Sequence, residues 1–355
     1  MEINEVKEWL CNAVEKEASD IFIGVGRSIS FKIDGTLIPQ GENILRPPDA
    51  EEILTALYEM SHRSMTKYIE KGDDDFPVSI PNVARFRVSA YRQRGTMAAI
   101  IRVVLFDIPD YTEFNIPDEV MKIASENHGL VLVTGAAGSG KTTTLACIIH
   151  AINQSRNCHI ITLEDPIEFL HKDKSSLISQ REISTDTESY LSALRACLRQ
   201  APDIILLGEM RDYETIKAAM TAAETGHLII STLHTIGAVS TIDRIIDVFP
   251  SEQQQQVRVQ LPMILRTVVT QQLLPTINGG LVPAYEIMHL NTAIRNLIRE
   301  AKTHQIDGII QTSAHEGMLN MDTSIFRLYQ SGTIAAETAI TYAINSDQMA
   351  RKVKI

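Results

Sequence analysis

The chain has 355 residues, of which 44% are hydrophobic and 22% charged, and its formal net charge is −11. This balance is typical of a globular protein of about two domains, and it excludes a disordered solvating chain and an integral membrane protein. Two stretches without charged residues, 225–242 and 267–285, are too polar or too interrupted by proline to be spanning helices.

The four cysteines are widely spaced and form no Cys-x-x-Cys pair. A metal knuckle or a disulfide framework is therefore disfavoured, and the pattern predicts a reducing, cytoplasmic location. The first twenty residues are acidic and amphipathic, without a basic segment leading into an apolar run, so we expect no signal peptide.

The first 105 residues predict a small α+β domain, because helical and strand periodicities follow one another. In chain order we expect a helix at 4–18, strands at 20–24 and 28–33, a helical segment at 49–69, a polar loop at 71–75, and strands at 84–92 and 96–104. Residues 106–117, with two prolines, are expected to form a linker between two different patterns.

From residue 118 to 355 the pattern predicts an α/β domain whose C-terminal part is mainly helical. Short apolar runs that are typical of buried parallel strands occur at 130–134, 159–163, 204–207 and 228–232. Each run is followed by a loop or a helical stretch, and helical patterns dominate beyond residue 251.

A phosphate-binding motif follows the first of these strands. It matches GxxxxGK[ST] at every fixed position and consists of Gly135, Ala136, Ala137, Gly138, Ser139, Gly140, Lys141 and Thr142, with Thr143 directly after it. Glycines allow backbone N–H groups to surround phosphates, and the start of the next helix favours anions. Lys141 is expected to reach the β- and γ-phosphates, and Thr142 to bind Mg²⁺.

Two later strands end in acidic residues. The strand at 204–207 leads to Glu209, which could hold Mg²⁺ directly or through water, or orient the attacking water. The strand at 159–163 leads to Glu164 and Asp165, and Glu164 could polarise water or share the metal's shell. The alternatives are an ion pair between Glu209 and Arg211, and a helix cap at Glu164–Asp165 beside Pro166.

His227 and His234 bracket the strand at 228–232, and either could sense the γ-phosphate or be an ordinary packed residue. Arg87 and Arg102 lie on two strands of the N-terminal domain. An arginine on a rigid strand can stabilise charge on a transferred phosphoryl group, although a solvated strand face is the simpler alternative for each.

Together these motifs resemble those of the type II/IV secretion ATPase superfamily, and most closely the type IV pilus retraction ATPase (PilT) family. The resemblance includes the phosphate-binding loop, the acidic segment 161–169, the strand leading to Glu209, the histidine segment 225–235, and 293–300, a signature of the retraction branch. The chain also lacks the tetracysteine insertion of type II secretion ATPases and many assembly ATPases.

The resemblance implies a homohexamer in which each subunit has a PAS-like N-terminal domain and a RecA-like ATPase domain. ATP with Mg²⁺ would be hydrolysed between them to drive pilus retraction and twitching motility, with Arg87 and Arg102 as candidates to approach the nucleotide. The implied partner is an inner-membrane pilus platform protein, reached at the inner face of the cell membrane, and no nucleic acid is expected.

Three alternative functions are compatible with the sequence. The first is a pilus-assembly or secretion motor of the same superfamily, and the second is a RecA-like nucleic-acid translocase, which the net charge of −11 disfavours. The third is a phosphate-loop scaffold without catalytic activity. The sequence also leaves open which glutamate, Glu164 or Glu209, is the general base.

Overall fold

The computed structural model describes residues 3–33, 35–81, 83–104 and 108–353. The chain divides into two compact units, residues 1–107 with 168–170 and residues 108–167 with 171–355. Residue 105 of the predicted N-terminal domain and the first two residues of the predicted linker lie outside the described residues. The described part of that linker, 108–117, belongs to the second unit.

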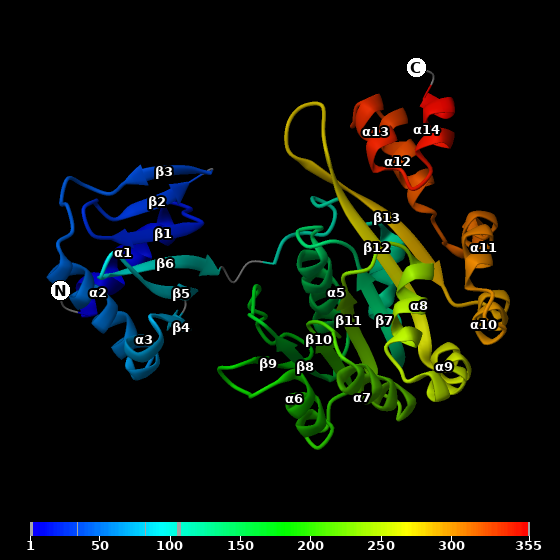
Figure 1. Ribbon diagram of the computed structural model, residues 1–355, viewed down its shortest axis with the longest axis horizontal. Coiled ribbons are helices and arrows are strands. Elements are labelled where there is room, and N and C mark those ends of the chain that lie inside the picture. The colour runs from blue at the N-terminus through cyan, green and yellow to red at the C-terminus, as the bar shows by residue number, and fades with distance from the viewer. Residues whose placement is uncertain (1–2, 34, 82, 105–107, 354–355) are drawn as a thin grey trace. The chain divides into compact units, whose positions relative to one another are not determined.

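The first unit contains one antiparallel sheet and a set of helices. Its described elements are α1 (Ile3–Glu15), β1 (Asp20–Gly24), β2 (Ser30–Ile33), β3 (Thr36–Pro39), α2 (Pro47–Met60), α3 (Thr66–Lys71), β4 (Asp73–Ile80), β5 (Ala84–Gln93) and β6 (Thr96–Val104). The strands follow the order β3-β2-β1-β6-β5-β4 (Figure 1). The expected first helix and the four expected strands of this region are therefore confirmed to within a few residues.

The core of the first unit follows from the two-residue period of its strands. In β5, Ala84, Phe86 and Val88 are buried, whereas Arg85 and Arg87, which alternate with them, are half-exposed. The buried side chains of the sheet form one hydrophobic cluster with those of α1 and α2. The arginines therefore lie on the sheet face opposite to the one that these helices cover.

Two expectations for the first unit were wrong. The helical segment expected at 49–69 is two helices, α2 and α3. The loop expected at 71–75 is mostly regular structure, because α3 ends at Lys71 and the edge strand β4 begins at Asp73. The acidic start of β4 is tolerated in a strand because Asp74, although buried, accepts hydrogen bonds from Lys67 Nζ at 2.6 Å and Tyr58 Oη at 3.1 Å.

The first helices of the second unit are α4 (Asp118–Met121) and a short 3₁₀ helix (Lys122–Ser125). They are followed by the strands and helices of a sheet that has helices on both faces. These are β7 (Gly129–Thr134), α5 (Lys141–Ser155), β8 (His159–Glu164), β9 (Leu177–Glu182), α6 (Tyr190–Cys197), β10 (Ile204–Leu207), α7 (Tyr213–Glu224), β11 (Leu228–Leu233), α8 (Ala238–Asp247) and α9 (Ser251–Ile264). The expected buried strands correspond to β7, β8, β10 and β11.

Seven strands form the sheet of the second unit, in the order β13-β12-β7-β11-β10-β8-β9 (Figure 1). All neighbouring strands are parallel except the edge pair β12–β13. One hydrophobic cluster packs α5 against one face of the sheet, and a second packs α6 to α10 against the other. The result is a three-layer α/β domain.

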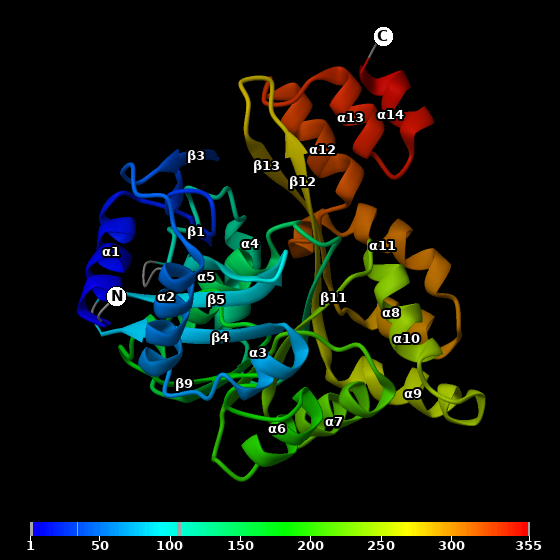
Figure 2. The same cartoon turned by 60° about the vertical axis from the view of Figure 1, so that its left-hand side comes forward.

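The mainly helical pattern expected beyond residue 251 missed a long hairpin. After α9 come β12 (Leu265–Pro275) and β13 (Leu281–His289), and then α10 (Thr292–Arg299), α11 (Ile306–Thr312), α12 (Met321–Gln330), α13 (Ala336–Tyr342) and α14 (Ser346–Val353). Figures 1 and 2 show the hairpin extending from the sheet towards α12. Its far end shares a hydrophobic cluster with α12 to α14, which buries Leu274 and Ala284.

No helix within the described residues combines the length and apolar character that crossing a bilayer requires.

Candidate active site

The phosphate-binding loop connects β7 to α5 in a conformation that only glycine permits at two positions. Gly135 has φ +142°, and a Cβ there would collide with the backbone oxygen of Gln271 on β12. Gly140 has φ +84°, and its Cβ would lie 2.8 Å from the Gln271 amide nitrogen. The loop therefore lies directly against β12, with Ala136, Ala137 and Gly138 exposed.

Lys141, in the first turn of α5, is 8% exposed and bends back over this loop. Its Nζ donates to the carbonyl oxygens of Gly135 and Ala136, each at 2.8 Å. Thr142 and Thr143 follow on the same turn and are half-exposed. The N–H groups of a helix start together with a lysine ammonium group form an anion-binding site.

Four parallel strands bring the other predicted residues to the same edge of the sheet. Leu207 of β10 lies opposite Leu163 of β8 and Ser231 of β11, while Leu233 of β11 lies opposite Thr134 of β7. The segments that follow these strands therefore begin side by side. This edge holds the phosphate-binding loop, both predicted glutamates and the second predicted histidine.

Glu209 follows β10 and faces two basic side chains. Its Oε2 lies 2.7 Å from Arg211 Nε and 3.4 Å from His234 Nε2. The Glu209 side chain is 16% exposed, whereas those of Arg211 and His234 are 73% and 50% exposed. The ion pair with Arg211 that we considered as an alternative is present, but its exposure makes it a weak source of stability.

Glu164 is the last residue of β8 and is 9% exposed. Its Oε1 accepts hydrogen bonds from Thr162 Oγ1 at 2.6 Å and from Gln180 Nε2 at 3.2 Å. The alternative of a helix cap is not supported, because the next described element after β8 is the strand β9. Glu164 is thus a buried carboxylate at the edge that carries the phosphate-binding loop.

His227 is not part of this arrangement. It precedes the first residue of β11, whereas His234 follows the last, so the two histidines lie at opposite edges of the sheet, about 20 Å apart along the strand. The His227 ring lies against its own turn, with Nδ1 3.0 Å from the Ala222 carbonyl oxygen. The sequence analysis named both histidines as candidates, although a parallel strand at 228–232 brings only the residue that follows it, His234, to the edge of the phosphate-binding loop.

Arg87 and Arg102 lie in the first unit, directly opposite each other on β5 and β6. Arg102 Nε pairs with Asp20 Oδ1 at 3.0 Å. Both arginines line a cavity of about 230 Å³ together with Asp20, Asp75, Ser89 and Ile100. Their approach to a nucleotide remains a prediction.

A second cavity, of about 340 Å³, lies beside the phosphate-binding loop and was not foreseen from the sequence. Its lining includes Gly140, Thr143 and Thr144 from the loop and α5, Gln271 and Leu273 from β12, Tyr285 from β13, and Phe114. Thr144 Oγ1 donates to Gln271 Oε1 at 2.8 Å. This cavity is contiguous with the anion site at the start of α5.

Tyr285 supplies a polar group to the cavity. It is 2% exposed, and its hydroxyl lies beside the Thr144 side chain without making a hydrogen bond of good geometry among the described residues. Burial raises the pKa of Tyr285, so the group stays a neutral phenol. Thr144 neighbours this hydroxyl but directs its own proton to Gln271. A buried, unpartnered hydroxyl is unfavourable unless a ligand completes its hydrogen bonds.

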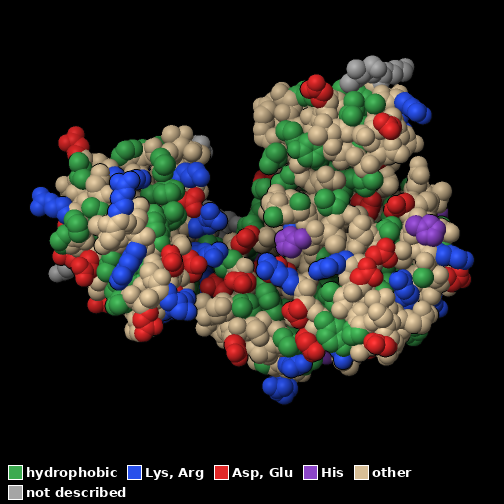
Figure 3. All heavy atoms as spheres, in the orientation of Figure 1, with side chains coloured by type: hydrophobic (Ala, Val, Ile, Leu, Met, Phe, Trp, Pro, Cys, Tyr) green, Lys and Arg blue, Asp and Glu red, His purple; other side chains and the backbone are tan. Residues whose placement is uncertain are grey.

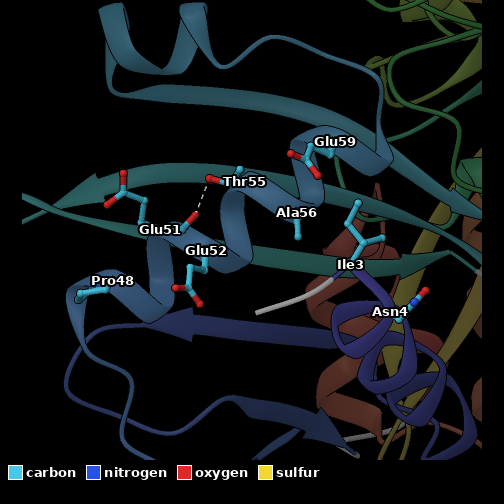
Figure 4. A pocket seen from close by; sticks show the side chains of 8 residues that line it. All are labelled: Ile3, Asn4, Pro48, Glu51, Glu52, Thr55, Ala56 and Glu59. Carbon is cyan, nitrogen blue, oxygen red and sulfur yellow. Dashed lines mark hydrogen bonds between the residues drawn. The ribbon is translucent and has the colours of Figure 1, made fainter.

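The first unit contains a wider groove, of about 690 Å³, that does not suit a nucleotide. Glu51, Glu52 and Glu59 of α2 line it together with Ile3, Asn4, Pro48, Thr55 and Ala56, as Figure 4 shows. These lining residues include no cation, and the carboxylates would repel phosphates. The cavity beside α5 is therefore the better candidate for a nucleotide.

Tyr190 is a further residue of the site edge that sequence reasoning missed. It begins α6, and its hydroxyl oxygen lies 2.8 Å from where a Cβ on Gly208 would be. Burial raises the pKa of Tyr190, with further contributions from Glu209, Asp165 and Glu164. The phenol is therefore neutral and packs against the glycine that precedes Glu209.

Comparisons with known proteins agree with this architecture. Residues 2–280 match the family described as Type II/IV secretion system protein. The chain is 48% identical over 283 residues to a twitching motility protein of Neisseria gonorrhoeae, covering 79% of this chain and 76% of the relative. It is 41% identical over 337 residues to the type IV pilus retraction ATPase PilT of Pseudomonas aeruginosa, covering 94% and 97%.

A solved structure of the pilus retraction motor PilT with bound ADP has a similar fold, with a TM-score of 0.90 and 43% identity, covering 97% of this chain and 98% of that one. Fold and glycine loop define the class of protein, a RecA-like P-loop ATPase with a smaller N-terminal domain. The chain belongs to the type II/IV secretion ATPase family and groups with the pilus retraction ATPases. The predicted family, fold class and enzyme class are confirmed.

The packing of Tyr190 against Gly208 makes a testable prediction. Gly208→Ala would place a methyl group 2.8 Å from Tyr190 Oη and 3.0 Å from the Leu163 carbonyl oxygen, and we expect it to lower the free energy of unfolding by about 1–3 kcal/mol. In the double variant G208A/Y190F part of this loss is recovered, because the hydroxyl is gone. Urea unfolding followed by circular dichroism measures both effects.

The matched control is Gly308→Ala, in α11 of the same unit, where a Cβ would meet no atom within 4 Å. Alanine is the better helix former, so this variant should be neutral or slightly more stable. Equal destabilisation by G208A and G308A, or no recovery in the double variant, would contradict the contact.

Proposed function

We propose that this chain is an ATP-hydrolysing motor that powers type IV pilus retraction and twitching motility. The observation that carries the proposal is the meeting of the phosphate-binding loop, Glu209 and Glu164 at one edge of a parallel sheet. Binding alone would need only the loop, whereas hydrolysis also needs carboxylates near the γ-phosphate. Two relatives that match most of the chain support the choice of process, because one is named a twitching motility protein and the other a type IV pilus retraction ATPase.

In this proposal the triphosphate lies over the start of α5, held by the loop N–H groups and by Lys141. The nucleoside extends into the cavity of about 340 Å³, where it meets Gln271 and the unpartnered Tyr285 hydroxyl. Gly135 and Gly140 have no room for a Cβ, which fits a loop whose backbone must approach phosphates closely. In this arrangement the phosphates pair with the Lys141 ammonium group, and the nucleoside offers a hydrogen-bond partner to the Tyr285 hydroxyl.

Mg²⁺ fits the donor set at this edge, because hydroxyl and carboxylate oxygens are its preferred protein ligands. We propose Thr142 and, directly or through water, Glu209 as the residues that hold it. When bound, the ion supplies neutralisation of the phosphate charge. The Glu209 carboxylate already lies beside the basic side chains of Arg211 and His234. Its position would therefore also suit a bound Mg²⁺ ion.

We assign the general base to Glu164. It is buried at the same edge, and Thr162 and Gln180 both bind its Oε1. A carboxylate that is fixed in this way can orient the attacking water and accept its proton. His234, 3.4 Å from Glu209, is suited to sense charge at the γ-phosphate through that glutamate.

The assembly and its setting are extrapolated from the family resemblance. We propose a homohexamer that acts at the cytoplasmic, inner face of the cell membrane on an inner-membrane pilus platform protein. Arg87 and Arg102 are proposed as the arginines of the N-terminal domain that approach a nucleotide, and Ala293–Glu300 as a contact surface for a neighbouring subunit or the platform. A ring-scale motion would then accompany hydrolysis.

Two other functions are less well supported. A pilus-assembly or secretion motor would share the same site, and only its physiological direction would differ. A nucleic-acid translocase would need a basic or aromatic stripe, whereas acidic and basic side chains are interspersed over the second unit on the face drawn in Figure 3. Strong stimulation of ATPase activity by single-stranded DNA would favour the translocase.

Loss of the gene distinguishes retraction from assembly. A deletion strain is expected to keep its surface pili, or to carry more of them, while losing twitching motility. Electron microscopy of pili and a surface-motility assay measure the two traits. A strain that lacks surface pili would instead indicate an assembly motor.

Substitutions at the sheet edge test the catalytic assignment. Lys141→Ala should abolish both nucleotide binding and hydrolysis, because it removes the ammonium group that lies against the loop proposed to hold the phosphates. Glu164→Gln and Glu209→Gln should keep nucleotide affinity within about threefold but lower kcat by about 100-fold or more. Steady-state ATPase kinetics and binding of a fluorescent ATP analogue give both quantities.

The matched control is Glu224→Gln, an exposed glutamate at the end of α7, which should hydrolyse ATP like the unmodified protein. A normal kcat in Glu164→Gln would overturn its assignment as the base. A normal kcat in Glu209→Gln would likewise remove that residue from the mechanism.

The cavity assignment predicts a different kinetic effect. Leu273→Trp would fill the space beside α5 and should raise KM for ATP by about tenfold or more, with little change in kcat, because only binding of the nucleoside is impaired. Inhibition by inorganic triphosphate, which has no nucleoside, should remain as strong as before. The control, Ile277→Trp at an exposed position of the same hairpin, should change neither value.

An unchanged KM in Leu273→Trp would contradict the cavity assignment while leaving the phosphate site intact. Weaker inhibition by inorganic triphosphate would show that the substitution disturbs the loop itself, and this result would also contradict the assignment.

A further inference from the structure

Behind Glu164 lies a set of polar side chains from the two neighbouring strands β8 and β9. Thr162 and Gln180 lie directly opposite each other in the parallel register of these strands. Because side chains alternate along a strand, Thr162 and Glu164 project on the same face of β8. Both donors therefore reach the Glu164 carboxylate from rigid elements of the sheet rather than from loops.

The two hydrogen bonds converge on one oxygen. Thr162 Oγ1 lies 2.6 Å and Gln180 Nε2 3.2 Å from Glu164 Oε1. Thr162 is fully buried, so its hydroxyl cannot exchange this bond for water. Two donors on one carboxylate oxygen restrict the Glu164 side chain to one rotamer. A single hydrogen bond would leave this side chain freer to rotate.

The orientation of the Gln180 amide is fixed independently. Its Oε1 accepts a hydrogen bond from the backbone N–H of His171 at 2.8 Å. Because a backbone N–H can only donate, it selects the amide oxygen, and the NH₂ group must then face Glu164. The segment that ends at His171 thus sets the direction of the donor that holds the carboxylate.

We propose that Thr162 and Gln180 are positioning residues that hold the Glu164 carboxylate in the geometry needed for hydrolysis. This inference rests on the proposed function, in which Glu164 orients and deprotonates the attacking water. Neither residue touches the reacting atoms in this account, and each acts through Glu164. Misplacement of a reacting group by about 1 Å can cost about 100-fold in rate, so such a role is measurable.

The test compares substitutions that keep or remove the donor. Thr162→Val keeps the branched shape without the hydroxyl, whereas Thr162→Ser keeps the hydroxyl. Gln180→Glu keeps an acceptor for the His171 N–H but places a carboxylate where the donor was. We expect T162V and Q180E to lower kcat by about 10- to 100-fold, with KM and the affinity for a fluorescent ATP analogue within about threefold.

Three further measurements separate positioning from a general loss of structure. T162S should recover kcat to within about threefold of the unmodified protein. Thr267→Val removes another buried hydroxyl of the same sheet, one that bonds the His289 ring at 3.0 Å, and should leave kcat unchanged. In a Glu164→Gln background, adding T162V should cause no further loss, because residues that act as a unit are not additive.

The outcomes distinguish failure of the proposed base, Glu164, from failure of the positioning role of Thr162 and Gln180. If E164Q hydrolyses ATP normally, the proposed role of Glu164 fails, and the positioning role fails with it. If E164Q is inactive while T162V and Q180E keep a normal kcat, only the positioning inference is overturned. A loss of kcat in T267V equal to that in T162V would also overturn it, because the effect would then be a general one.

Discussion

The parallel register of β7, β11, β10 and β8 is the constraint on which the site depends. Strands that run in the same direction deliver the segments that follow them to one edge of the sheet. This edge gathers the glycine loop, His234, Glu209 and Glu164 from four separate parts of the chain. If one of these strands ran the other way, its chemical group would lie at the opposite edge of the sheet, as His227 does.

The remaining parts of the structure shape this edge. β12 forms the wall behind the glycine loop, where the backbone of Gln271 leaves no room for a Cβ on Gly135. β8 and β9 hold Glu164 through Thr162 and Gln180. Lys141 at the start of α5 supplies the positive charge beside the loop, whereas the flanking strands supply rigid support. The residues proposed to bind the nucleotide and those proposed for catalysis therefore come from different strands of one sheet.

Much of this could be predicted from the sequence, because strong local patterns encode it. The positions of the glycine loop, of the four strands β7, β8, β10 and β11, and of the acids at or just after the ends of β8 and β10 were predicted correctly. The β12–β13 hairpin was missed because its apolar stretch, interrupted by Pro275 and Pro283, carries no simple alternation. The cavity at Tyr285 and the support by Gln180 depend on contacts between distant segments, which no local pattern encodes. His227 was named as a candidate because it adjoins the strand, but it precedes β11 and so lies at the edge opposite to the phosphate-binding loop.

The most direct measurement is an experimental structure of the chain with Mg²⁺ and a non-hydrolysable ATP analogue. The account predicts a γ-phosphate about 3 Å from Lys141 Nζ, with the carboxylates of Glu164 and Glu209 facing it and the nucleoside beside Tyr285. A triphosphate bound away from this edge, or a γ-phosphate remote from both carboxylates, would contradict the central claim.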